Sequence, residues 1–453
     1  MEIVVVGMGY VGIPSAALFA DVEGFNVTGV QRRSKRSGWK IDHLNNGKSP
    51  IEGDEPGLAE LIKSVVDKGK LTVTDDISVC KNADVILLDV QTPVDEFHIP
   101  QYKSLKDVSG DVGKYMKKGA MVIIESTVAP GTTNYLIEPI LENNSNMIAG
   151  LDFNLVYSYQ RVTLGRLLHN IKFLPRIVGG LTPKGTERAI KFYKNICSAQ
   201  IYPTDTVTAE VSKITETTYR DVNIAFANEI ALICECLGVD VNEVRQYVNS
   251  MPFEPSNPLK NPYKMMHAPG AGVGGHNLPK DAWLLKSCID KYGSEKIIPK
   301  ILLESREIND YMPLHMKKLV QRALTEKNIN LADAKICILG FAFLEDSNDT
   351  LNTPALPLFN ALKNKCKQIT IHDSFVKECE NLPIFNDLKK AITDANCIVV
   401  VTPHSEYKNI DLNWLKSTLS TPVIIDGRNI FNPKKCVDAG FTYRGVGVGK
   451  IKD

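Results

Sequence analysis

Short apolar segments alternate with amphipathic ones through the first 180 residues of this 453-residue chain. Apolar runs of strand length, bounded by turn residues, are typical of buried strands, and their alternation with helical patterns is typical of β–α–β units. Runs of this kind lie at residues 3–6, 26–30, 85–88, 121–124 and 177–178. The pattern therefore predicts an α/β region built on a parallel sheet.

A different pattern occupies the middle of the chain. Residues 205–237 contain neither glycine nor proline, Thr204 or Asp205 is suited to cap the start of a helix, and Gly238 is suited to end it. A helix of that length spans roughly 50 Å, so we expect a central spine that also offers a subunit interface. Residues 251–279 are rich in proline, glycine and asparagine, which predicts a long functional loop.

The strand-and-helix alternation resumes near Lys335 and predicts a second α/β domain in the C-terminal third. Its apolar runs lie at residues 336–339, 369–371, 398–401 and 423–425. We expect three domains, at residues 1–200, 201–320 and 321–453. The predicted fold is α/β, with two doubly wound (Rossmann-like) domains joined by a long central helix.

The composition of the chain argues against several kinds of partner but does not indicate a function. The chain is 43% hydrophobic and 23% charged, with a formal net charge of +1, which favours neither nucleic acid nor an anionic membrane as partner. Ten scattered cysteines show no zinc-like spacing, so we expect no metal site and reduced thiols in the cytoplasm. The apolar N-terminus lacks the basic start of a signal peptide.

A glycine pattern follows the first predicted strand and opens a helix predicted at residues 13–20. In this context G-x-G-x-x-G is a dinucleotide-binding fingerprint. Gly7 makes the tight turn, Gly9 lets a pyrophosphate approach the backbone, and Gly12 allows close packing of helix on strand. The helix N-terminus then faces the phosphates. The loop consists of Gly7, Met8, Gly9, Tyr10, Val11 and Gly12.

The end of the second predicted strand is where such a fold normally has an acidic residue for the adenosine ribose. Here the strand is followed by Gln31, Arg32 and Arg33. Gln31 is able to hydrogen-bond a ribose diol, and Arg32 or Arg33 is equally able to accept a 2′-phosphate. From these residues alone, NAD and NADP both stay open.

Two further motifs follow predicted strands. Thr92 and Pro93 come after the third strand, and Thr127 comes shortly after the fourth. Ligands of open α/β sheets gather at the C-terminal ends of strands, so we expect these residues beside the dinucleotide. Ordinary turn chemistry is the alternative for either motif alone. Together with the glycine fingerprint, binding is favoured.

Residues 270–281, Gly-Ala-Gly-Val-Gly-Gly-His-Asn-Leu-Pro-Lys-Asp, resemble the active-site signature of the UDP-glucose/GDP-mannose dehydrogenase family. Similar motifs occur at residues 125–132, 209–210 and 219–229, and the resemblance runs over nearly the whole chain, most strongly to the branch that oxidises UDP-N-acetyl-D-mannosamine. It implies NAD as the cofactor, bound by the N-terminal domain, and a UDP-sugar bound by the C-terminal domain. It also implies a homodimer or a higher homo-oligomer.

The resemblance assigns roles to several side chains. Lys213 matches the lysine that stabilises the developing oxyanion, and Asp281 matches the aspartate that positions water or the substrate alcohol for proton transfer. Thr127 matches a threonine close to the reacting sugar, His276 the histidine of the signature, and Arg428 a basic residue at the nucleotide-sugar end. Further substrate contacts are expected from Arg161, Gly272, Gly274 and Gly275.

Five positions depart from the family pattern. Asn277 stands where the family has its nucleophilic cysteine, and Gln160 stands where the family uses a glutamate in proton transfer. Thr217 replaces an asparagine that helps to bind the oxyanion and shares a helix face with the lysine four residues earlier. Leu344 and Leu351 remove two cations expected near the nucleotide-sugar or the domain junction.

These departures bear on the reaction. The family oxidises an alcohol to an aldehyde and then to an acid, and the second step needs a thiolate that an amide does not supply. We therefore favour an NAD-dependent UDP-sugar oxidoreductase that oxidises once, or returns the hydride in an epimerisation or elimination. The alternatives are a UDP-N-acetyl-D-mannosamine 6-dehydrogenase that reaches the acid without cysteine, and a non-catalytic nucleotide-sugar binder.

Overall fold

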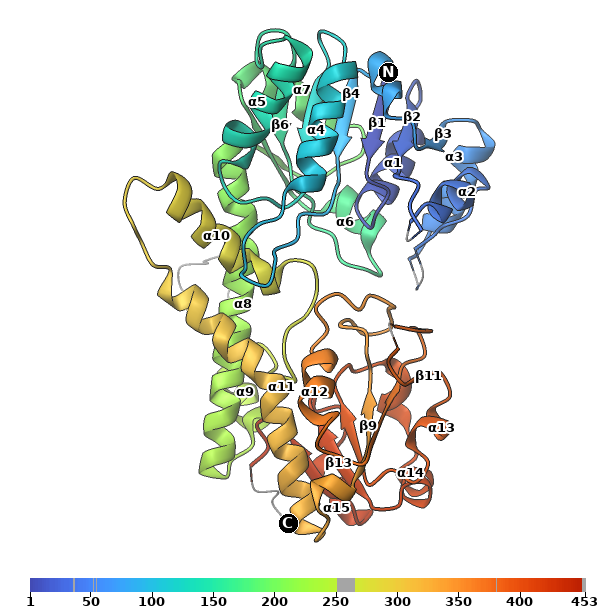
Figure 1. The fold of residues 1–453 in the computed structure, drawn as a ribbon, viewed down its shortest axis with the longest axis vertical. Helices are drawn as coiled ribbons and strands as arrows, with labels where there is room; N and C mark the ends of the chain where they lie inside the picture. Colours follow the sequence, from blue (N-terminus) through green and yellow to red (C-terminus); the bar gives the residue numbers. More distant parts are fainter. Residues whose placement is uncertain (36, 52, 54, 251–264, 380, 450–453) are drawn as a thin grey trace. The chain divides into compact units, whose positions relative to one another are not determined.

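The computed structural model describes residues 1–449 except residues 36, 52, 54, 251–264 and 380 (Figure 1). The chain divides into two compact units. The first comprises Met1–Glu216 and Trp283–Ile298, and the second comprises Thr217–Ala282 and Pro299–Asp453. The expected division into three domains stays a prediction.

The first unit contains an eight-stranded sheet in the order β3-β2-β1-β4-β5-β6-β7-β8. All neighbouring strands are parallel except β6 and β7, which are antiparallel. The strands are β1 (Glu2–Val6), β2 (Asn26–Val30), β3 (Leu71–Thr74), β4 (Val85–Leu88), β5 (Met121–Ile124), β6 (Asn154–Tyr157), β7 (Arg176–Gly180) and β8 (Ile201–Asp205). The predicted parallel sheet is confirmed for β1 to β6.

The prediction is wrong where β7 joins this sheet. Only the short helix α6 (Leu167–Phe173) lies between β6 and β7. Seven helical residues span about 10 Å, which is too short to return the chain to the opposite end of the strands. Strand β7 therefore starts at the end of the sheet where β6 stops, and Tyr157 pairs with Gly179 in antiparallel register.

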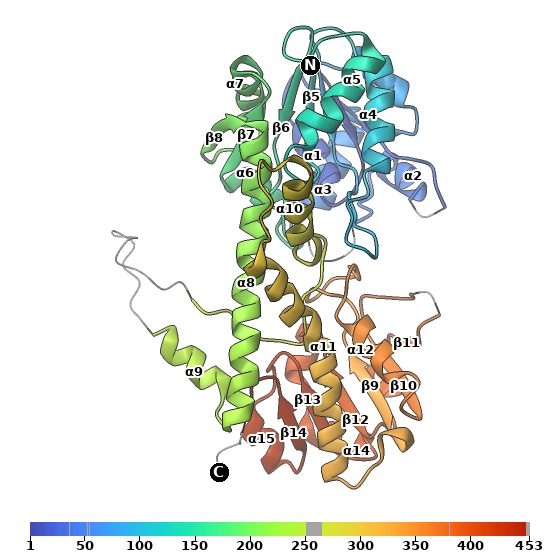
Figure 2. The ribbon, with the colours of Figure 1, turned by 60° about the vertical axis from the view of Figure 1, so that its left-hand side comes forward.

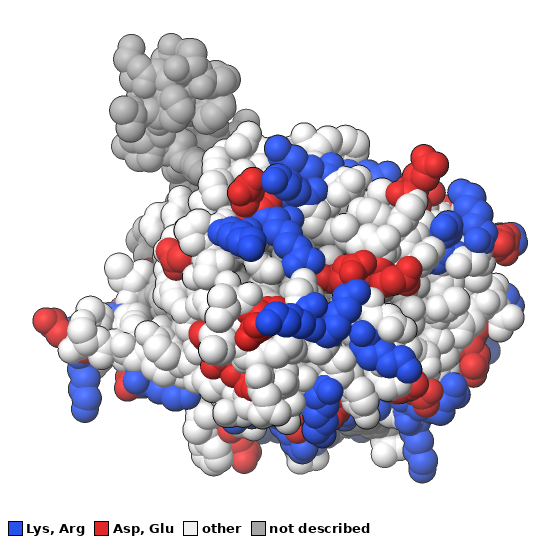
Figure 3. Space-filling view, turned by 90° about the horizontal axis from the view of Figure 1, so that it is seen from above, with Lys and Arg blue, Asp and Glu red and all other residues white. Residues whose placement is uncertain are grey.

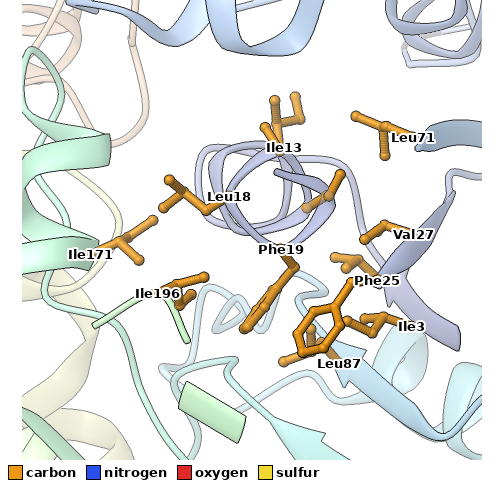
Figure 4. Close-up of a cluster of buried hydrophobic side chains, with 14 of the residues drawn as sticks. Ile3, Ile13, Leu18, Phe19, Phe25, Val27, Leu71, Leu87, Ile171 and Ile196 are labelled. Atoms are coloured by element: carbon orange, nitrogen blue, oxygen red, sulfur yellow. The ribbon is translucent and has the colours of Figure 1, made fainter. Parts of the chain in front are cut away.

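Both faces of the first sheet are covered, as doubly wound folds require. Ile3 and Val5 of β1 enter the hydrophobic cluster shared with α1, part of which is drawn in Figure 4. Val4 and Val6 enter the cluster on the other face, with α4 and α5. Besides α6, the helices that connect the strands of this unit are α1 (Gly12–Ala20), α2 (Trp39–Asn45), α3 (Leu58–Asp67), α4 (Lys103–Tyr115), α5 (Glu138–Ser145) and α7 (Pro183–Tyr193).

The second unit contains a fully parallel six-stranded sheet in the order β11-β10-β9-β12-β13-β14. Its strands are β9 (Lys335–Leu339), β10 (Gln368–His372), β11 (Ile384–Phe385), β12 (Cys397–Val400), β13 (Val423–Asp426) and β14 (Thr442–Gly445). Ile336 and Ile338 belong to the hydrophobic cluster that includes residues of α11 and α12, and Cys337 and Leu339 belong to the cluster that includes residues of α14 and α15. Figure 2 shows these helices around the sheet. The helices are α9 (Val241–Val248), α11 (Lys300–Glu326), α12 (Ala355–Leu362), α13 (Leu388–Ile392), α14 (Leu412–Thr418) and α15 (Pro433–Asp438).

Two helices run from one unit into the other along the chain: α8 (Thr206–Leu237) and α10 (Leu278–Tyr292). The predicted long helix is confirmed as α8, which has 32 residues. Asp205 caps it, because its side chain accepts a hydrogen bond from the N–H of Thr208 at 2.8 Å, and Gly238 follows it with φ +72°. Residues 251–264 of the predicted loop at 251–279 lie outside the described residues, residues 265–277 belong to no helix or strand, and the last two residues belong to α10.

Charge is mixed over the surface in view in Figure 3, where lysine and arginine side chains alternate with acidic ones. This pattern matches the nearly neutral formal net charge. Among the described residues, no helix has the length and apolar character needed to cross a membrane.

Candidate functional site

The fingerprint loop between β1 and α1 has the backbone geometry that a dinucleotide needs. Gly7 has φ +106°, and a Cβ there would lie 2.3 Å from the carbonyl oxygen of Asp89. A Cβ on Gly12 would lie 2.0 Å from the carbonyl oxygen of Gly7. A Cβ on Gly9 would meet nothing within 4 Å, so this side of the loop is open to a pyrophosphate. Half-buried Tyr10 and Val11 lead into α1, whose N-terminus faces this space.

The end of β2 is tied to the same loop. The Oε1 of Gln31 accepts a hydrogen bond from the N–H of Met8 at 3.1 Å. Gln31 thus lies where the ribose-binding residue of such folds lies. Arg32 follows it with an exposed side chain.

The structure brings the two threonine motifs together. The Oγ1 of Thr92 donates to the carbonyl oxygen of Thr127 at 2.5 Å, and the hydroxyl of Ser126 donates to the carbonyl oxygen of Val90 at 2.7 Å. Both motifs follow neighbouring strands, β4 and β5, at their C-terminal ends. Exposed Pro93 completes the first turn, where its carbonyl accepts from the N–H of Gln101.

A buried polar cluster lies under these turns. The Oε1 of Glu125 accepts hydrogen bonds from Gln160 Nε2 at 2.9 Å, from Arg176 at 3.0 Å and from the Tyr193 hydroxyl at 2.7 Å. Burial, and then the neighbouring Glu125, raise the pKa of Asp89 well above its ordinary value, which favours the protonated form of Asp89. A glutamate at position 160 would bring a third carboxyl group to this cluster. The amide of Gln160 instead donates a hydrogen bond to Glu125.

Lys213 of α8 is buried, with 6% of its surface exposed. Its Nζ donates to the backbone oxygen of Gln160 at 3.3 Å and lies 5.2 Å from the centre of the Tyr159 ring. Arg161 makes an ion pair with Glu216 at 2.7 Å. The segment that carries Gln160 is thus fastened to the first part of α8, and a sugar contact by Arg161 stays a prediction.

In the second unit, Asp281 is fully buried between two donors. The Oγ1 of Thr217 donates to its Oδ2 at 2.5 Å, and Nζ of Lys280 lies 2.9 Å from its Oδ1. Sequence reasoning named Asp281 and Thr217 but missed Lys280. The only local signal was its position next to Asp281, because a lysine beside an aspartate is usually solvated; here 8% of Lys280 is exposed.

The glycines of residues 270–275 serve close packing within the second unit. A Cβ on Gly272 would lie 3.0 Å from Pro354, and Cβ atoms on Gly274 and Gly275 would lie 2.6 and 2.8 Å from Phe343. Contacts of these glycines with a substrate stay a prediction.

Side chains hold this glycine loop at both ends. His276 Nε2 lies 2.6 Å from Asp349 Oδ2, next to the segment that carries half-exposed Leu351. At the other end, the amide of Asn228 accepts from the N–H of Gly270 at 2.8 Å and donates to Asn309 at 2.8 Å. These contacts fix the loop that precedes Asn277.

Arg428 is also committed to this loop. Its Nε donates to the carbonyl oxygen of Val401 at 2.7 Å, and its NH2 donates to that of Gly272 at 3.1 Å. Burial lowers its pKa to about 10. Within the second unit Arg428 therefore ties the glycine loop to the C-terminal edge of the sheet. Its expected role at the nucleotide-sugar stays a prediction.

Asn277 is half-buried and immediately precedes α10. Its backbone carbonyl accepts from the N–H groups of Lys280 and Asp281, at 3.0 and 2.9 Å. A residue here lies at a helix N-terminus, where backbone N–H groups favour negative charge. A cysteine at this position would be activated, but an amide is not.

Three family models cover most of the chain. The NAD binding domain of the UDP-glucose/GDP-mannose dehydrogenase family matches residues 1–197, the central domain matches 207–311, and the UDP binding domain matches 337–433. A UDP-N-acetyl-D-mannosamine dehydrogenase from Pyrococcus horikoshii is 35% identical over 452 residues, which is 100% of both chains. The chain belongs to this family.

Solved structures of family members have the same fold. A UDP-D-ManNAc dehydrogenase from Pyrococcus horikoshii, 35% identical, has a TM-score of 0.89 over 100% of both chains. An NDP-N-acetyl-D-galactosaminuronic acid dehydrogenase from Methanosarcina mazei, 40% identical, has a TM-score of 0.85 over 98% of this chain and 95% of that one. The likeness confirms two Rossmann-like domains with a long central helix, and the first domain is the family's NAD-binding domain.

Proposed function

We propose that this family member is an NAD-dependent oxidoreductase of a UDP-N-acetylhexosamine or its uronic acid, and that it does not use the thioester-dependent second oxidation. The family membership supports the UDP-sugar, and the names of the two relatives above support an N-acetylated hexose. The observation that carries the altered chemistry is Asn277 at the N-terminus of α10, with Lys213 and Asp281 retained.

Bound NAD supplies a hydride acceptor, and this chain's residues supply charge and proton handling. Lys213, a cation in a buried site, stabilises the alkoxide that forms as the sugar alcohol loses its proton. Asp281 takes part in proton transfer, and Lys280 and Thr217 hold its two oxygens in place. Thr127 lies at the sheet edge where substrates of this fold bind.

Seven of the ten cysteines lack the environment of a nucleophile. A reactive thiol needs a lowered pKa. Burial instead raises the thiol pKa of each cysteine with a resolved shift: Cys80, Cys234, Cys288, Cys337, Cys366, Cys397 and Cys436. This supports a reaction that ends, or turns back, after one hydride transfer.

Incubation of the purified chain with NAD and UDP-N-acetylmannosamine, UDP-N-acetylglucosamine or a UDP-uronic acid tests the proposal. We expect a product that has lost two hydrogens, or an epimer or elimination product with no net NADH. A sugar acid as the main product would contradict it. Unchanged sugar together with tight NAD and UDP-sugar binding would instead indicate a non-catalytic binder.

The second candidate is a UDP-N-acetyl-D-mannosamine 6-dehydrogenase that forms the acid directly from a hydrated aldehyde. The buried pair of Lys280 and Asp281 favours it, because a carboxylate held beside an ammonium group is suited to orient water. It predicts an acid product whose formation needs no covalent intermediate, so two NADH would form per sugar while mass spectrometry of the protein during turnover shows no acyl adduct.

We also infer a homodimer through α8. Within the second unit this helix exposes Tyr219, Phe226 and Ile233, with 56%, 54% and 47% of their surfaces accessible. Their seven-residue spacing places them on one face, which suits packing against a second helix. Light scattering of wild type and Phe226→Glu tests the dimer, and a monomeric wild type would contradict it.

We also infer a cytoplasmic location, which is supported by the finding that all ten cysteines are free thiols.

A further inference from the structure

The adenosine end of the dinucleotide site differs in charge from the usual NAD pattern. Sites that select NAD place a carboxylate at the end of the second strand, which binds the ribose hydroxyls and repels a 2′-phosphate. Here Gln31 occupies that place, and its side chain is used within the protein: Oε1 accepts from Met8, and Nε2 donates to Ser37 Oγ at 3.0 Å. We propose that this site accepts an adenosine 2′-phosphate, so that NADP binds at least as tightly as NAD.

Hydrogen-bonding groups gather around the Gln31 amide. The hydroxyls of Ser34 and Ser37 lie 2.9 Å apart, and the N–H of Ser37 donates to Ser34 Oγ at 3.2 Å. The N–H of Ser34 donates to the carbonyl oxygen of Arg32 at 3.0 Å, which closes a tight turn that begins at Arg32 and is centred on Arg33. Two hydroxyls and a guanidinium are the groups that bind a phosphate monoester.

The charges nearby separate Arg32 from the arginine that follows it. Arg33 is neutralised by Asp75 at 3.1 Å and by Asp42 at 4.0 Å. Among the described residues, no carboxylate lies within 4.0 Å of Arg32, and the nearby Asp107 makes its own ion pair with Lys103 at 2.8 Å.

A further cation lies on the fingerprint side of this turn. Lys40 Nζ donates to the carbonyl oxygen of Met8 at 3.2 Å. The turn therefore presents the positive charge of Arg32 where a 2′-phosphate would add about two negative charges.

Equilibrium binding to the full chain tests this inference without sugar turnover, although the inference rests on the proposed nicotinamide chemistry. The dissociation constants of NAD and NADP are measured by calorimetry at one ionic strength for wild type, Arg32→Gln and Arg33→Gln. We expect Arg32→Gln to raise the dissociation constant of NADP by at least about tenfold and to leave that of NAD within about twofold of wild type. The matched Arg33→Gln variant should change the dissociation constants of both cofactors by less than about threefold, because Arg33 is already paired.

A second variant approaches the same site from the opposite direction. Gln31→Asp places a carboxylate at the end of the second strand, as in sites that select NAD. We expect this variant to bind NADP at least about tenfold more weakly than wild type and to retain NAD binding. An NADP affinity of wild type more than about twofold below that for NAD would overturn the proposal. So would an Arg32→Gln variant that weakens both cofactors equally. Failure of the sugar reaction with tight NADP binding would overturn the proposed function alone.

Discussion

The two glycine-rich loops of this chain, residues 7–12 and 270–275, look alike in sequence but are built differently. In the first, glycine is required by nearby backbone: Gly7 against Asp89, and Gly12 against Gly7 itself. In the second, glycine makes room for side chains from distant segments, among them Phe343 and Pro354. The first loop is constrained by its own backbone and by that of the neighbouring strand end after β4, whereas the second depends on side chains from several segments of the second unit.

The difference concerns chemistry as well as packing. The first loop retains every glycine of the dinucleotide fingerprint, and the family model for NAD binding covers it. The second loop leads to Asn277, where the resemblance to the family expects a cysteine. Under the proposed function, cofactor binding and hydride transfer are retained while the acyl-transfer step is altered. Changes to the reacting side chains should therefore alter the rate or the product, and changes around the cofactor loop should alter cofactor binding or stability and leave the product the same.

The largest expected effect comes from the cation at the reacting end. Lys213→Ala should lower the rate of NADH formation from the UDP-sugar by about 10²–10³, because a buried positive charge no longer stabilises the alkoxide. Steady-state kinetics with each cofactor at saturation measures this. Lys213→Arg keeps the charge and is the matched control, with thermal unfolding to verify the fold. A loss of less than about tenfold in Lys213→Ala would contradict its role.

Asn277→Cys should change the outcome of the reaction. A thiol at the N-terminus of α10 has a lowered pKa, so it is able to attack the aldehyde and hold a thioester. We expect the NADH yield to rise from at most one to two per sugar consumed. Asn277→Ser offers a weaker nucleophile at the same place and should leave the yield unchanged. An unchanged yield in Asn277→Cys would mean that residue 277 is not at the reaction centre.

The second loop should also be sensitive to the side chain that holds its start. Asn228→Ala removes the acceptor for the N–H of Gly270 and the donor to Asn309, which should lower the free energy of unfolding by about 1–3 kcal/mol. Urea unfolding measures this. Asn223→Ala, on the same helix, removes only a hydrogen bond to the carbonyl oxygen of Tyr219 and should cost less than about 0.5 kcal/mol. Equal losses in the two variants would refute the special role of Asn228.

The smallest effect is expected beside the first loop, from Asp89. Because its pKa is raised in the folded state, the folded chain keeps a proton that the unfolded chain releases above about pH 4. Its contribution to stability is therefore present at low pH and lost as the pH rises. Asp89→Asn mimics the protonated form and should flatten the dependence. Urea midpoints between about pH 5 and pH 8 measure this, and parallel curves for both proteins would contradict it.

The sequence predicted best those elements of the fold that depend on residues close together along the chain. Strands β1, β2, β4 and β5 and helix α8 follow from apolar runs and from the absence of glycine and proline, and they are confirmed. Strand β14 escaped prediction because Thr442–Gly445 has no apolar run. The reversal at β7 depended on the length of a connection.

At the candidate site, the same limit applies to contacts between distant residues. The pairing of Asp89 with Glu125 joins two separate strands, and no pattern in the sequence links them. The burial of Lys280 depends on how the second unit folds around Asp281. Assigned roles that came from the family resemblance, such as those of Arg161 and Arg428, stay predictions because both side chains are bonded within the protein.

The most direct test of the account is the number of NADH molecules formed per UDP-N-acetylhexosamine consumed by the wild-type chain. The measurement follows NADH absorbance against sugar loss in one reaction, with mass spectrometry of the protein during turnover. The account predicts at most one NADH per sugar and an unmodified protein. Two NADH per sugar, or an acyl adduct on any side chain, would contradict it.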